Sequence, residues 1–322
     1  MRLLLACLLA AAAGAAAGEP YGERAEVRAF IGQLVERHGF VESELTQLFS
    51  RVRRADPVIE AMERPAEATR SWPDYRAIFL GEKRIAEGVQ FWQKHRRTLE
   101  RAERAYGVPP QIVVAIIGVE TFYGRNTGAW RVVDALATLA FDYPPRAGFF
   151  RNELENYLIF ARDRGVDVFA MRGSYAGAMG MPQFMPSSAR RYGVDFDKDG
   201  HVDLRRSTDS IGSVANFLKQ HGWQRGGQVC LRAQAEGEAR RFASGSLRPE
   251  TKLAELVAAG VVLEPAPADP EASAALIDLD GELRAGLQNF YVITRYNRSA
   301  LYAAAVCDLA EALAARAQSA GR

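Results

Sequence analysis

The chain has 322 residues, of which 48% are apolar and 25% carry a charge at neutral pH. This composition excludes disorder over most of the chain, and the length predicts two or three domains. Lys and Arg together number 41 and Asp and Glu number 39, so the net charge is +2. A charge so close to zero argues against a nucleic-acid binder.

The first residues predict an export signal. Arg2 precedes a short apolar run and an alanine-rich stretch that ends at Ala17. One positive charge, an apolar run and small residues are the parts of a secretory signal peptide. The run is shorter than the roughly 20 apolar residues of a membrane span, although an uncleaved anchor is the alternative. We therefore expect residues 1–18 to be a signal peptide and the mature protein to be periplasmic. Lipid attachment at Cys7 stays open, although that residue stands too early for a normal lipoprotein signal.

Helices are expected over most of residues 19–105. Apolar side chains recur at helical spacing from Val27 to Val35, and a second helix begins at Ser43. A long amphipathic segment runs from Gly81 to Tyr106. These features predict an N-terminal helical domain.

Residues 106–225 are expected to form a second, helical domain. A nearly all-apolar stretch from about Pro110 to Tyr123 predicts a central, buried helix. Further helices are expected at Gly148–Arg164 and Ile211–His221. Between them, the stretch Gly173–Ser188 is rich in Gly, Pro, Met and Ser, which predicts an ordered loop.

The character of the sequence changes after Gly226. Short β-like stretches at residues 228–231, 261–263 and 274–279 surround a cluster of prolines. They predict a small inserted domain with β-strands over residues 226–285. Residues 286–322 are expected to be a helical return to the main body. The fold class expected is therefore mainly α, and α+β overall.

The cysteines give no clear signal. Cys7, Cys230 and Cys307 are too few and too scattered in the sequence to predict a zinc site or a disulfide framework. In an oxidising compartment Cys230 and Cys307 could pair. Two separate buried thiols are the alternative.

Glu120 is the most informative single residue. On a helix, its neighbours three, four and seven positions earlier are Ile117, Ile116 and Val113. A carboxylate on such an apolar face loses hydration, and desolvation raises the pKa of a carboxylate. A general acid that works near neutral pH needs a raised pKa. A structural glutamate that caps a backbone group or pairs with an arginine is the alternative.

Four sequence motifs resemble those of the B-type lytic murein transglycosylases. They occur in order along the chain as Gly118–Gly128 (GVETFYGRNTG), Gly177–Ser188 (GAMGMPQFMPSS), Ala215–Trp223 (ANFLKQHGW) and Asn289–Ser299 (NFYVITRYNRS) with Tyr302. The resemblance spans about residues 24–315. It implies that residues 106–225 form a lysozyme-like catalytic core.

The resemblance also implies a reaction. Members of this family cleave the β-1,4 bond between N-acetylmuramic acid and N-acetylglucosamine in peptidoglycan. They use no water, because the muramyl 6-hydroxyl attacks its own anomeric carbon and leaves a 1,6-anhydro end. Glu120 would serve first as the acid and then as the base. Most glycosidases need two carboxylates; here the nearest other candidates, Asp134 and Asp142, lie outside the matching motifs.

Substrate-contacting residues are implied by position in the same motifs and beside them. They are Tyr75, Arg146, Ser174, Gln183, Tyr296, Asn297 and Tyr302. Ser174 and Gln183 would hold acetamido groups or orient Glu120, and Tyr302 would donate a hydrogen bond near the acid. The expected partners are peptidoglycan glycan strands, with cell-wall synthesis or hydrolysis proteins as further candidates, and the protein is expected to be a monomer.

Regularly spaced acidic residues predict a calcium site at residues 195–209. Acids occupy loop positions 1, 3 and 5, and Gly200 stands at position 6, as in an EF-hand. Position 12 is Arg206 instead of an acid, so a longer loop would be needed. The candidate ligands are Asp195, Asp197, Asp199, His201 through its backbone carbonyl, and Asp209. The ion would be structural, and no organic cofactor is expected. A solvated acidic turn without metal is the alternative.

Two other functions stay open. A hydrolytic muramidase of lysozyme type would use the same scaffold, but it would need an attacking water and, in most cases, a second carboxylate. A non-catalytic, calcium-dependent glycan-binding protein would not need Glu120 for its biological effect.

Overall fold

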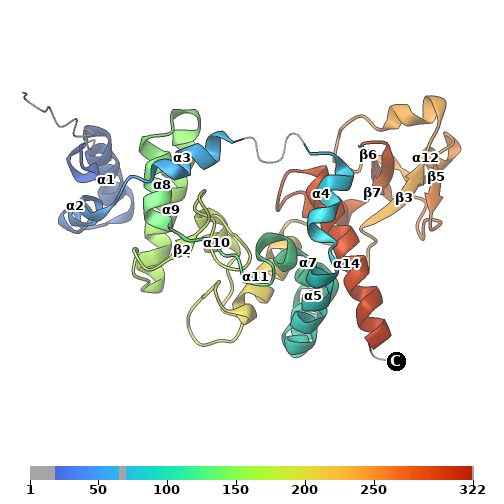
Figure 1. Ribbon diagram of the computed structural model, residues 1–322, viewed down its shortest axis with the longest axis horizontal. Coiled ribbons are helices and arrows are strands. Elements are labelled where there is room, and N and C mark those ends of the chain that lie inside the picture. The colour runs from blue at the N-terminus through green and yellow to red at the C-terminus, as the bar shows by residue number, and fades with distance from the viewer. Residues whose placement is uncertain (1–18, 65–69, 321–322) are drawn as a thin grey trace, which may run out of the picture. The chain divides into compact units, whose positions relative to one another are not determined.

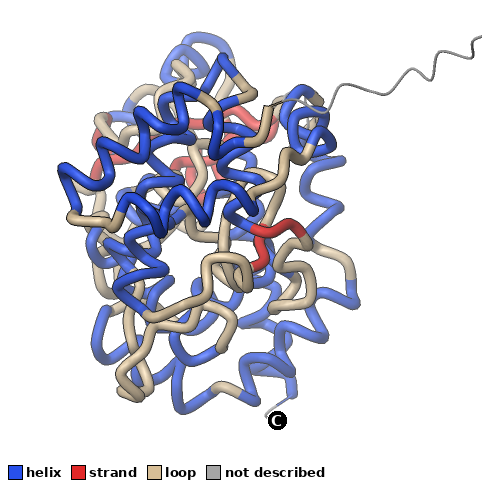
Figure 2. Tube along the Cα trace, turned by 90° about the vertical axis from the view of Figure 1, so that its left-hand side faces the viewer, coloured by secondary structure: helices blue, strands red, loops and turns tan. Residues whose placement is uncertain are grey.

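The structure is a computed structural model that describes residues 19–64 and 70–320. Residues 1–18, where the export signal is expected, lie outside the described residues. The chain divides into two compact units, with the boundary in the sequence between Arg53 and Arg54. Helices dominate the structure and the few strands are short, as Figures 1 and 2 show (Figure 1; Figure 2). The predicted mainly α class, with an α+β character overall, is therefore confirmed. The domain boundaries expected from the sequence stay a prediction.

The first unit is a small helical cluster. Its elements are η1 (Tyr21–Glu23), α1 (Ala25–His38) and α2 (Glu42–Arg51). Apolar residues of α1 at helical spacing are buried, and Phe30 of α1 meets Phe49 of α2 edge to face at 6.1 Å between ring centroids. The pair fills the interior that the two amphipathic faces share.

The second unit contains the central helix and most of the other helices. Those before the five-stranded sheet are α3 (Asp56–Glu63), α4 (Trp72–Phe79), α5 (Glu82–Lys94), α6 (Arg96–Tyr106), α7 (Pro110–Thr121), α8 (Val132–Phe141), η2 (Pro144–Arg146), α9 (Ala147–Arg164), α10 (Pro186–Tyr192) and α11 (Ser207–Gln220). Those within or after it are η3 (Gly237–Phe242), α12 (Leu253–Ala258), α13 (Gln288–Ile293) and α14 (Ala300–Ala320). The segment expected to be continuous from Gly81 to Tyr106 is two helices, because the backbone leaves the helical conformation at His95.

Helix α7 is the core of this unit, as the sequence predicts. Pro110 occupies its first turn, where the missing N–H costs nothing. Its apolar side chains are buried on all sides, because α5, α6, α11 and α14 pack around it. None of the described helices combines the length and the apolar character that crossing a membrane requires.

The inserted region folds as a five-stranded antiparallel sheet in the order β4-β6-β7-β3-β5. Its strands are β3 (Cys230–Gln234), β4 (Thr251–Lys252), β5 (Val262–Glu264), β6 (Ser273–Leu279) and β7 (Glu282–Gly286). Strand β7 was not predicted. Asp280 and Gly281, both with positive φ, form the tight turn between β6 and β7, and Asp-Gly between strands is a strong hairpin signal.

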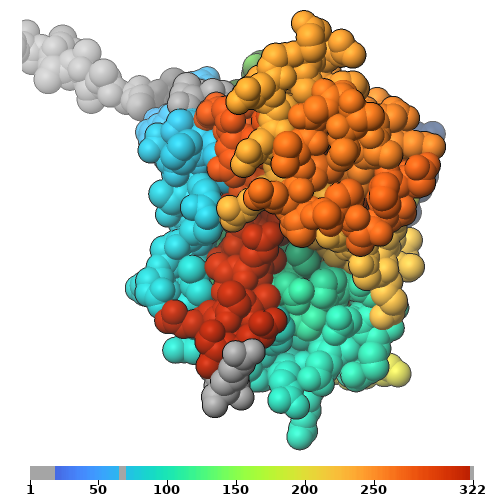
Figure 3. Space-filling model, turned by 90° about the vertical axis from the view of Figure 1, so that its right-hand side faces the viewer, coloured from blue at the N-terminus to red at the C-terminus, as the bar shows by residue number. Residues whose placement is uncertain are grey.

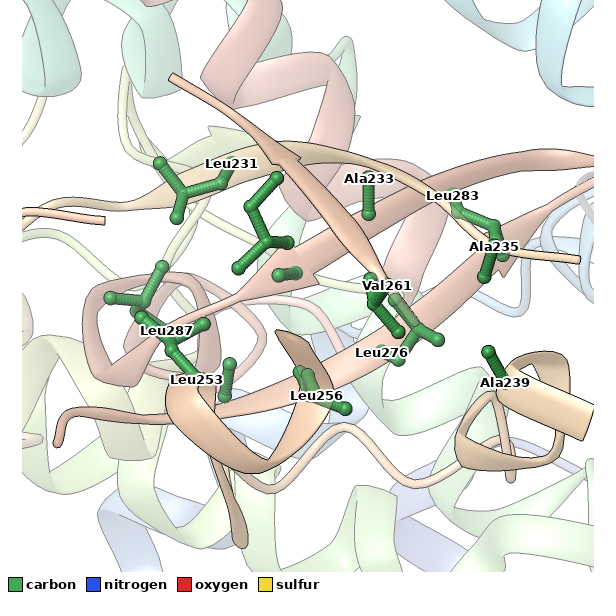
Figure 4. Close-up of a cluster of buried hydrophobic side chains, with 13 residues drawn as sticks. Leu231, Ala233, Ala235, Ala239, Leu253, Leu256, Val261, Leu276, Leu283 and Leu287 are labelled. Atoms are coloured by element: carbon green, nitrogen blue, oxygen red, sulfur yellow. The ribbon is translucent and has the colours of Figure 1, made fainter. Parts of the chain in front are cut away.

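Both faces of this sheet are covered. Figure 4 shows Leu253 and Leu256 of α12 gathered with Leu276 and Leu283 on one face. The opposite face meets the helical body, because β6 contacts α14. Burial on both faces explains why β6 is almost continuously apolar instead of alternating. In Figure 3 the orange surface of the sheet lies directly above the red surface of α14.

Candidate active site

The carboxylate of Glu120 is held by a buried tyrosine. Glu120 lies in the last turn of α7 and is half-buried. The hydroxyl of Tyr302, from α14, donates a hydrogen bond to Glu120 Oε1 at 2.6 Å. Tyr302 is only 2% exposed. The contact between α7 and α14 therefore fixes the position of the predicted acid.

Two tyrosines lie together at this point. The rings of Tyr296 and Tyr302 are parallel to within 10° and their centroids are 6.4 Å apart. Burial raises the pKa of both hydroxyls well above the usual value for tyrosine, and the negative charge of Glu120 adds to the rise. Both tyrosines therefore stay protonated at physiological pH, so Tyr302 is the donor toward Glu120. Tyr296 donates instead to the carbonyl of Pro182 at 2.6 Å.

The backbone after Glu120 is strained. Phe122 and Tyr123 have φ of 51° and 61°, a conformation that residues with a side chain rarely adopt. The hydroxyl of Tyr123 donates to the carbonyl of Arg84 at 3.0 Å. A Cβ at Gly118 would lie 2.7 Å from the Tyr123 ring, so a glycine is needed there. Strained residues of this kind cluster at functional sites because the surrounding structure must hold them in place.

The first and second motifs are joined by hydrogen bonds. The Thr121 hydroxyl donates to the Met181 carbonyl at 3.0 Å and accepts from the amide of Gly124 at 3.0 Å. Gln183, with φ of 49°, donates its amide to the carbonyls of Thr127 and Gly180 at 3.2 and 2.8 Å. Gln183 therefore connects the loop after Glu120 to its own loop.

A small sheet brings the two motif loops together. Strand β1 (Trp130–Arg131) follows the first motif and pairs antiparallel with β2 (Arg172–Gly173), which precedes the second. Isolated bridges from Gly173 to Met179 and from Met179 to Phe184 order the second loop. The sequence predicts an ordered loop here, and the structure shows that backbone pairing orders it.

The other residues expected to contact the substrate differ in their surroundings. The Ser174 hydroxyl accepts from the amide of Ala178 at 3.1 Å, which closes the turn before the second motif. Asn297 is half-buried and follows Tyr296 in the loop between α13 and α14. Tyr75 is buried on α4, close enough to Tyr302 to contribute to its raised pKa. Of these three residues, Tyr75 is the one that the structure connects to the glutamate–tyrosine contact.

Arg146 is the exception. Its guanidinium lies over the rings of Phe149 and Phe150, at 4.5 and 5.2 Å from their centroids. Arg146 is exposed. Its place beside a glycan stays a prediction.

Arg84 is a positioning residue that the sequence did not reveal. Its guanidinium donates to the carbonyl of Gly118, in the last turn of α7, and lies 4.6 Å from the centroid of the Phe122 ring. A positive charge at the C-terminal end of a helix is favourable. Glu87, on the same helix as Arg84, forms an ion pair with Arg125 at 3.0 Å. Only the packing of α5 on α7 shows this role.

The other carboxylates considered for catalysis are neutralised by arginines. Asp134 is paired with Arg131 at 2.6 Å, and Asp142 is paired with Arg54 at 3.2 Å. Each is held in an ion pair of its own. Glu120 receives the Tyr302 hydroxyl.

Three acidic residues of the predicted calcium loop converge. Asp195, Asp197 and Asp209 each place a carboxylate oxygen within 4.8 Å of the others. Asp209 is fully buried and accepts from the amides of Phe196 and Asp203 at 2.9 and 2.8 Å. Burial raises the pKa of Asp209, and the negative charges of Asp197 and Asp195 add to the rise. A bound cation would remove the electrostatic repulsion between these carboxylates.

The loop also contains an unsatisfied acceptor. Oδ1 of Asp197 is buried and has no hydrogen-bond partner among the described residues, and buried acceptors are rarely left unpaired. Asp199 accepts from the amide of His201 at 3.0 Å and lies outside the cluster of three. Arg206 pairs with both Asp197 and Asp199. The carboxylate set fits a hard cation such as calcium.

The helical core and its glutamate–tyrosine site define the class of protein. Residues 22–311 match the transglycosylase SLT domain family. The chain therefore belongs to this family, the lytic transglycosylases, and is an enzyme of that class. The predicted resemblance to the B-type lytic murein transglycosylases and the lysozyme-like core are confirmed.

Individual relatives are similar over most of the chain. Membrane-bound lytic murein transglycosylase B of Escherichia coli is 42% identical over 307 residues, which cover 91% of this chain and 84% of the relative. The crystal structure of catenated lytic transglycosylase SltB1 of Pseudomonas aeruginosa is 48% identical, with a TM-score of 0.88 over 92% of this chain and 99% of that one. The Escherichia coli lytic transglycosylase Slt35 in complex with calcium is 40% identical, with a TM-score of 0.81 over 94% of this chain and 96% of that one.

Proposed function

We propose that the protein cleaves the β-1,4 bond between N-acetylmuramic acid and N-acetylglucosamine in peptidoglycan and leaves 1,6-anhydromuramyl ends. The observation that carries this proposal is the hydrogen bond of 2.6 Å from Tyr302 to Glu120 at the end of the buried helix α7. It places one oriented carboxylate in a partly apolar setting, with strained loops beside it.

Glu120 acts twice in this mechanism. As an acid, it gives its proton to the glycosidic oxygen while the bond to the muramyl anomeric carbon breaks. As a base, it takes the proton of the muramyl 6-hydroxyl when that oxygen bonds to the anomeric carbon. The proton count of the enzyme is restored, and no water is consumed. Proximity of the 6-hydroxyl replaces the separate nucleophile of other glycosidases.

Tyr302 is proposed to orient the carboxylate through both steps. Because its pKa is raised well above the usual value, it stays a donor throughout. Ser174, Gln183, Tyr296 and Asn297 are proposed to contact the glycan around the scissile bond. Tyr75 and Arg146 are proposed to line the glycan groove further away.

We also propose that residues 195–209 bind a calcium ion for a structural purpose. The carboxylates of Asp195, Asp197 and Asp209 would hold the ion, with the proposed addition of Asp199 and the His201 carbonyl. The loop supports the second motif, because the Leu204 carbonyl accepts from the amide of Met181 at 2.8 Å. The calcium complex of the relative Slt35 supports this proposal.

The proposed location is the periplasm, and the proposed partners are glycan strands of peptidoglycan. The export signal expected in residues 1–18 and the name of the membrane-bound relative support an extracytoplasmic site of action. A monomer is sufficient for the proposed reaction, because Glu120 and Tyr302 come from one chain.

Product analysis tests the reaction. Purified peptidoglycan is digested with the native protein and with Glu120→Gln, and the fragments are analysed by mass spectrometry. We expect 1,6-anhydromuramyl ends from the native protein and a loss of turnover of about 100- to 10,000-fold in Glu120→Gln, with glycan binding retained, because the amide cannot donate an acidic proton. Reducing ends would instead identify a hydrolytic muramidase, and wild-type turnover by Glu120→Gln would exclude a catalytic role for this residue.

A further inference from the structure

Two cysteines far apart in the sequence meet in the structure. Cys230 begins β3, and Cys307 lies in the middle of α14. Their sulfur atoms and a carboxylate oxygen of Glu311 all lie within 4.8 Å of one another. Both cysteines are free thiols; Cys307 is buried and Cys230 is partly exposed. The whole inserted sheet lies between them in the sequence, so only the packing of the sheet on α14 brings them together.

The surrounding contacts hold the two elements in this register. Arg284 of β7 and Asp308 of α14, both 3% exposed, form an ion pair at 2.7 Å. Asp308 is the neighbour of Cys307, and β7 pairs with β3 with Gly286 opposite Cys230. The thiols therefore meet across a packed and paired interface. The sulfur atoms of a disulfide are about 2 Å apart. Rotation of the two side chains must therefore bring the sulfur atoms closer together before they can bond.

A disulfide fits this cluster better than a metal ion. The described cluster offers two sulfurs and one carboxylate, which is fewer than the four ligands of a structural zinc site. The guanidinium of Arg284 lies 4.0 Å from Cys230 Sγ and would repel a cation. The neighbouring Cys230 thiol raises the pKa of Cys307, and burial raises it further. In the absence of a metal, Cys307 is therefore a protonated thiol at neutral pH.

We propose that Cys230 and Cys307 form an intramolecular disulfide when the protein reaches an oxidising compartment. The oxidant is a disulfide-bearing thiol oxidoreductase or a small-molecule disulfide. The thiolate of Cys230 attacks the external disulfide and releases its first half as a thiolate. Cys307 then gives its proton to Glu311, 3.9 Å away, and attacks the Cys230 sulfur, which releases the second half. Two protein thiols are oxidised, and one external disulfide is reduced to two thiols.

The bond would tie the inserted sheet to the helix that positions the acid. Helix α14 carries both Cys307 and Tyr302, the donor to Glu120. A cross-link that closes a long loop restricts the unfolded chain and stabilises the folded one. The proposal does not depend on the glycan chemistry, since it concerns only the sheet and α14.

Thiol trapping tests the proposal. The protein is produced with its own leader, collected after export, quenched in acid and alkylated, and then mapped by mass spectrometry without reduction. We expect a linked peptide pair that contains Cys230 and Cys307, and no alkylation at either position. Native protein should lose about 5–10 °C of melting temperature on reduction, while Cys230→Ser and Cys307→Ser should not respond to the reductant.

The purified, reduced protein gives a second measurement that does not depend on export. Incubation with glutathione disulfide should produce the same linked pair in the native chain and only a glutathione adduct at Cys230 in Cys307→Ser. Alkylation of both thiols in the exported protein, together with no linked pair under glutathione disulfide, would overturn the proposal. A stoichiometric zinc ion that protects both thiols would overturn it as well.

Discussion

Glu120 and Tyr302 form the contact on which the chemistry depends. The hydrogen bond of 2.6 Å joins a half-buried carboxylate to a fully buried phenol. A hydrogen bond to an ionised group stabilises the ionised form. The tyrosine therefore orients the acid and favours its ionised form.

Replacement of Tyr302 by phenylalanine should change the pH dependence of the enzyme. Without the donor, the ionised carboxylate is less stable, so the acid keeps its proton to higher pH. We expect the upper limb of the pH–rate profile to move up by about one to two units, since a hydrogen bond to a charged group contributes about 1.5–3 kcal/mol. Turnover should fall by at least 10-fold because the carboxylate is less well oriented. The measurement is the rate of glycan fragment release between acid and alkaline pH.

Tyr296→Phe is the matched control for this experiment. It removes the same hydroxyl from the ring beside Tyr302, but that hydroxyl donates to the Pro182 carbonyl instead of Glu120. We expect lower turnover or stability with no shift of the upper limb. An equal shift in both variants would contradict a specific role for Tyr302.

At the scale of elements, the acidic loop 195–209 and the second motif depend on each other. The Leu204 carbonyl accepts from Met181, and a Cβ at Gly180 would collide with Leu204 at 2.3 Å. A bound cation would neutralise the converging carboxylates behind this contact. The loop that carries Gln183 is thereby connected to the proposed calcium site.

Calcium should stabilise the protein, and Asp197→Asn should abolish the effect. At an ion concentration about 100 times the dissociation constant, binding contributes about 2.7 kcal/mol, or a rise in melting temperature of about 5–10 °C. Chelation should reverse it. Asp203→Asn is the matched control, because the Asp203 carboxylate pairs with Arg205 and lies outside the cluster of three. An unchanged melting temperature of the native protein in millimolar calcium would refute the site.

At the scale of the whole second unit, a buried ion pair joins the inserted sheet to the helical body. Asp308 of α14 pairs with Arg284 of β7 and also with Arg76 of α4. The negative charge of Asp308 helps raise the pKa of Arg284 against the opposing effect of burial. Three elements that are distant in sequence therefore meet at one carboxylate.

Asp308→Ala should destabilise the protein by about 3–5 kcal/mol, because it leaves a buried arginine without its main partner. Denaturant unfolding in reducing buffer measures the change without a contribution from the cysteines. Glu271→Ala is the matched control, since Glu271 pairs with Lys252 at the surface, where such pairs contribute less than about 1 kcal/mol. Equal losses of unfolding free energy in the two variants would show that the buried ion pair stabilises the protein no more than a surface pair does.

The sequence alone was sufficient for much of this protein. The apolar periodicity of residues 110–123 placed Glu120 on a buried helix, and the motifs identified the family and the loops around the acid. Local patterns can do this because helix burial and turn residues are encoded by neighbours within a few positions. The Asp280-Gly281 turn is a local signal of the same kind that would have located β7.

Contacts between distant residues were decided only by the tertiary structure. The bond from Tyr302 to Glu120 was expected from the resemblance, but its geometry depends on the packing of α14 on α7. The support from Arg84 and the meeting of Cys230 with Cys307 had no local signal. The residues next to each cysteine in the sequence do not indicate which element will pack against it. Which elements pack together depends on the burial of whole faces of the sheet and the helices.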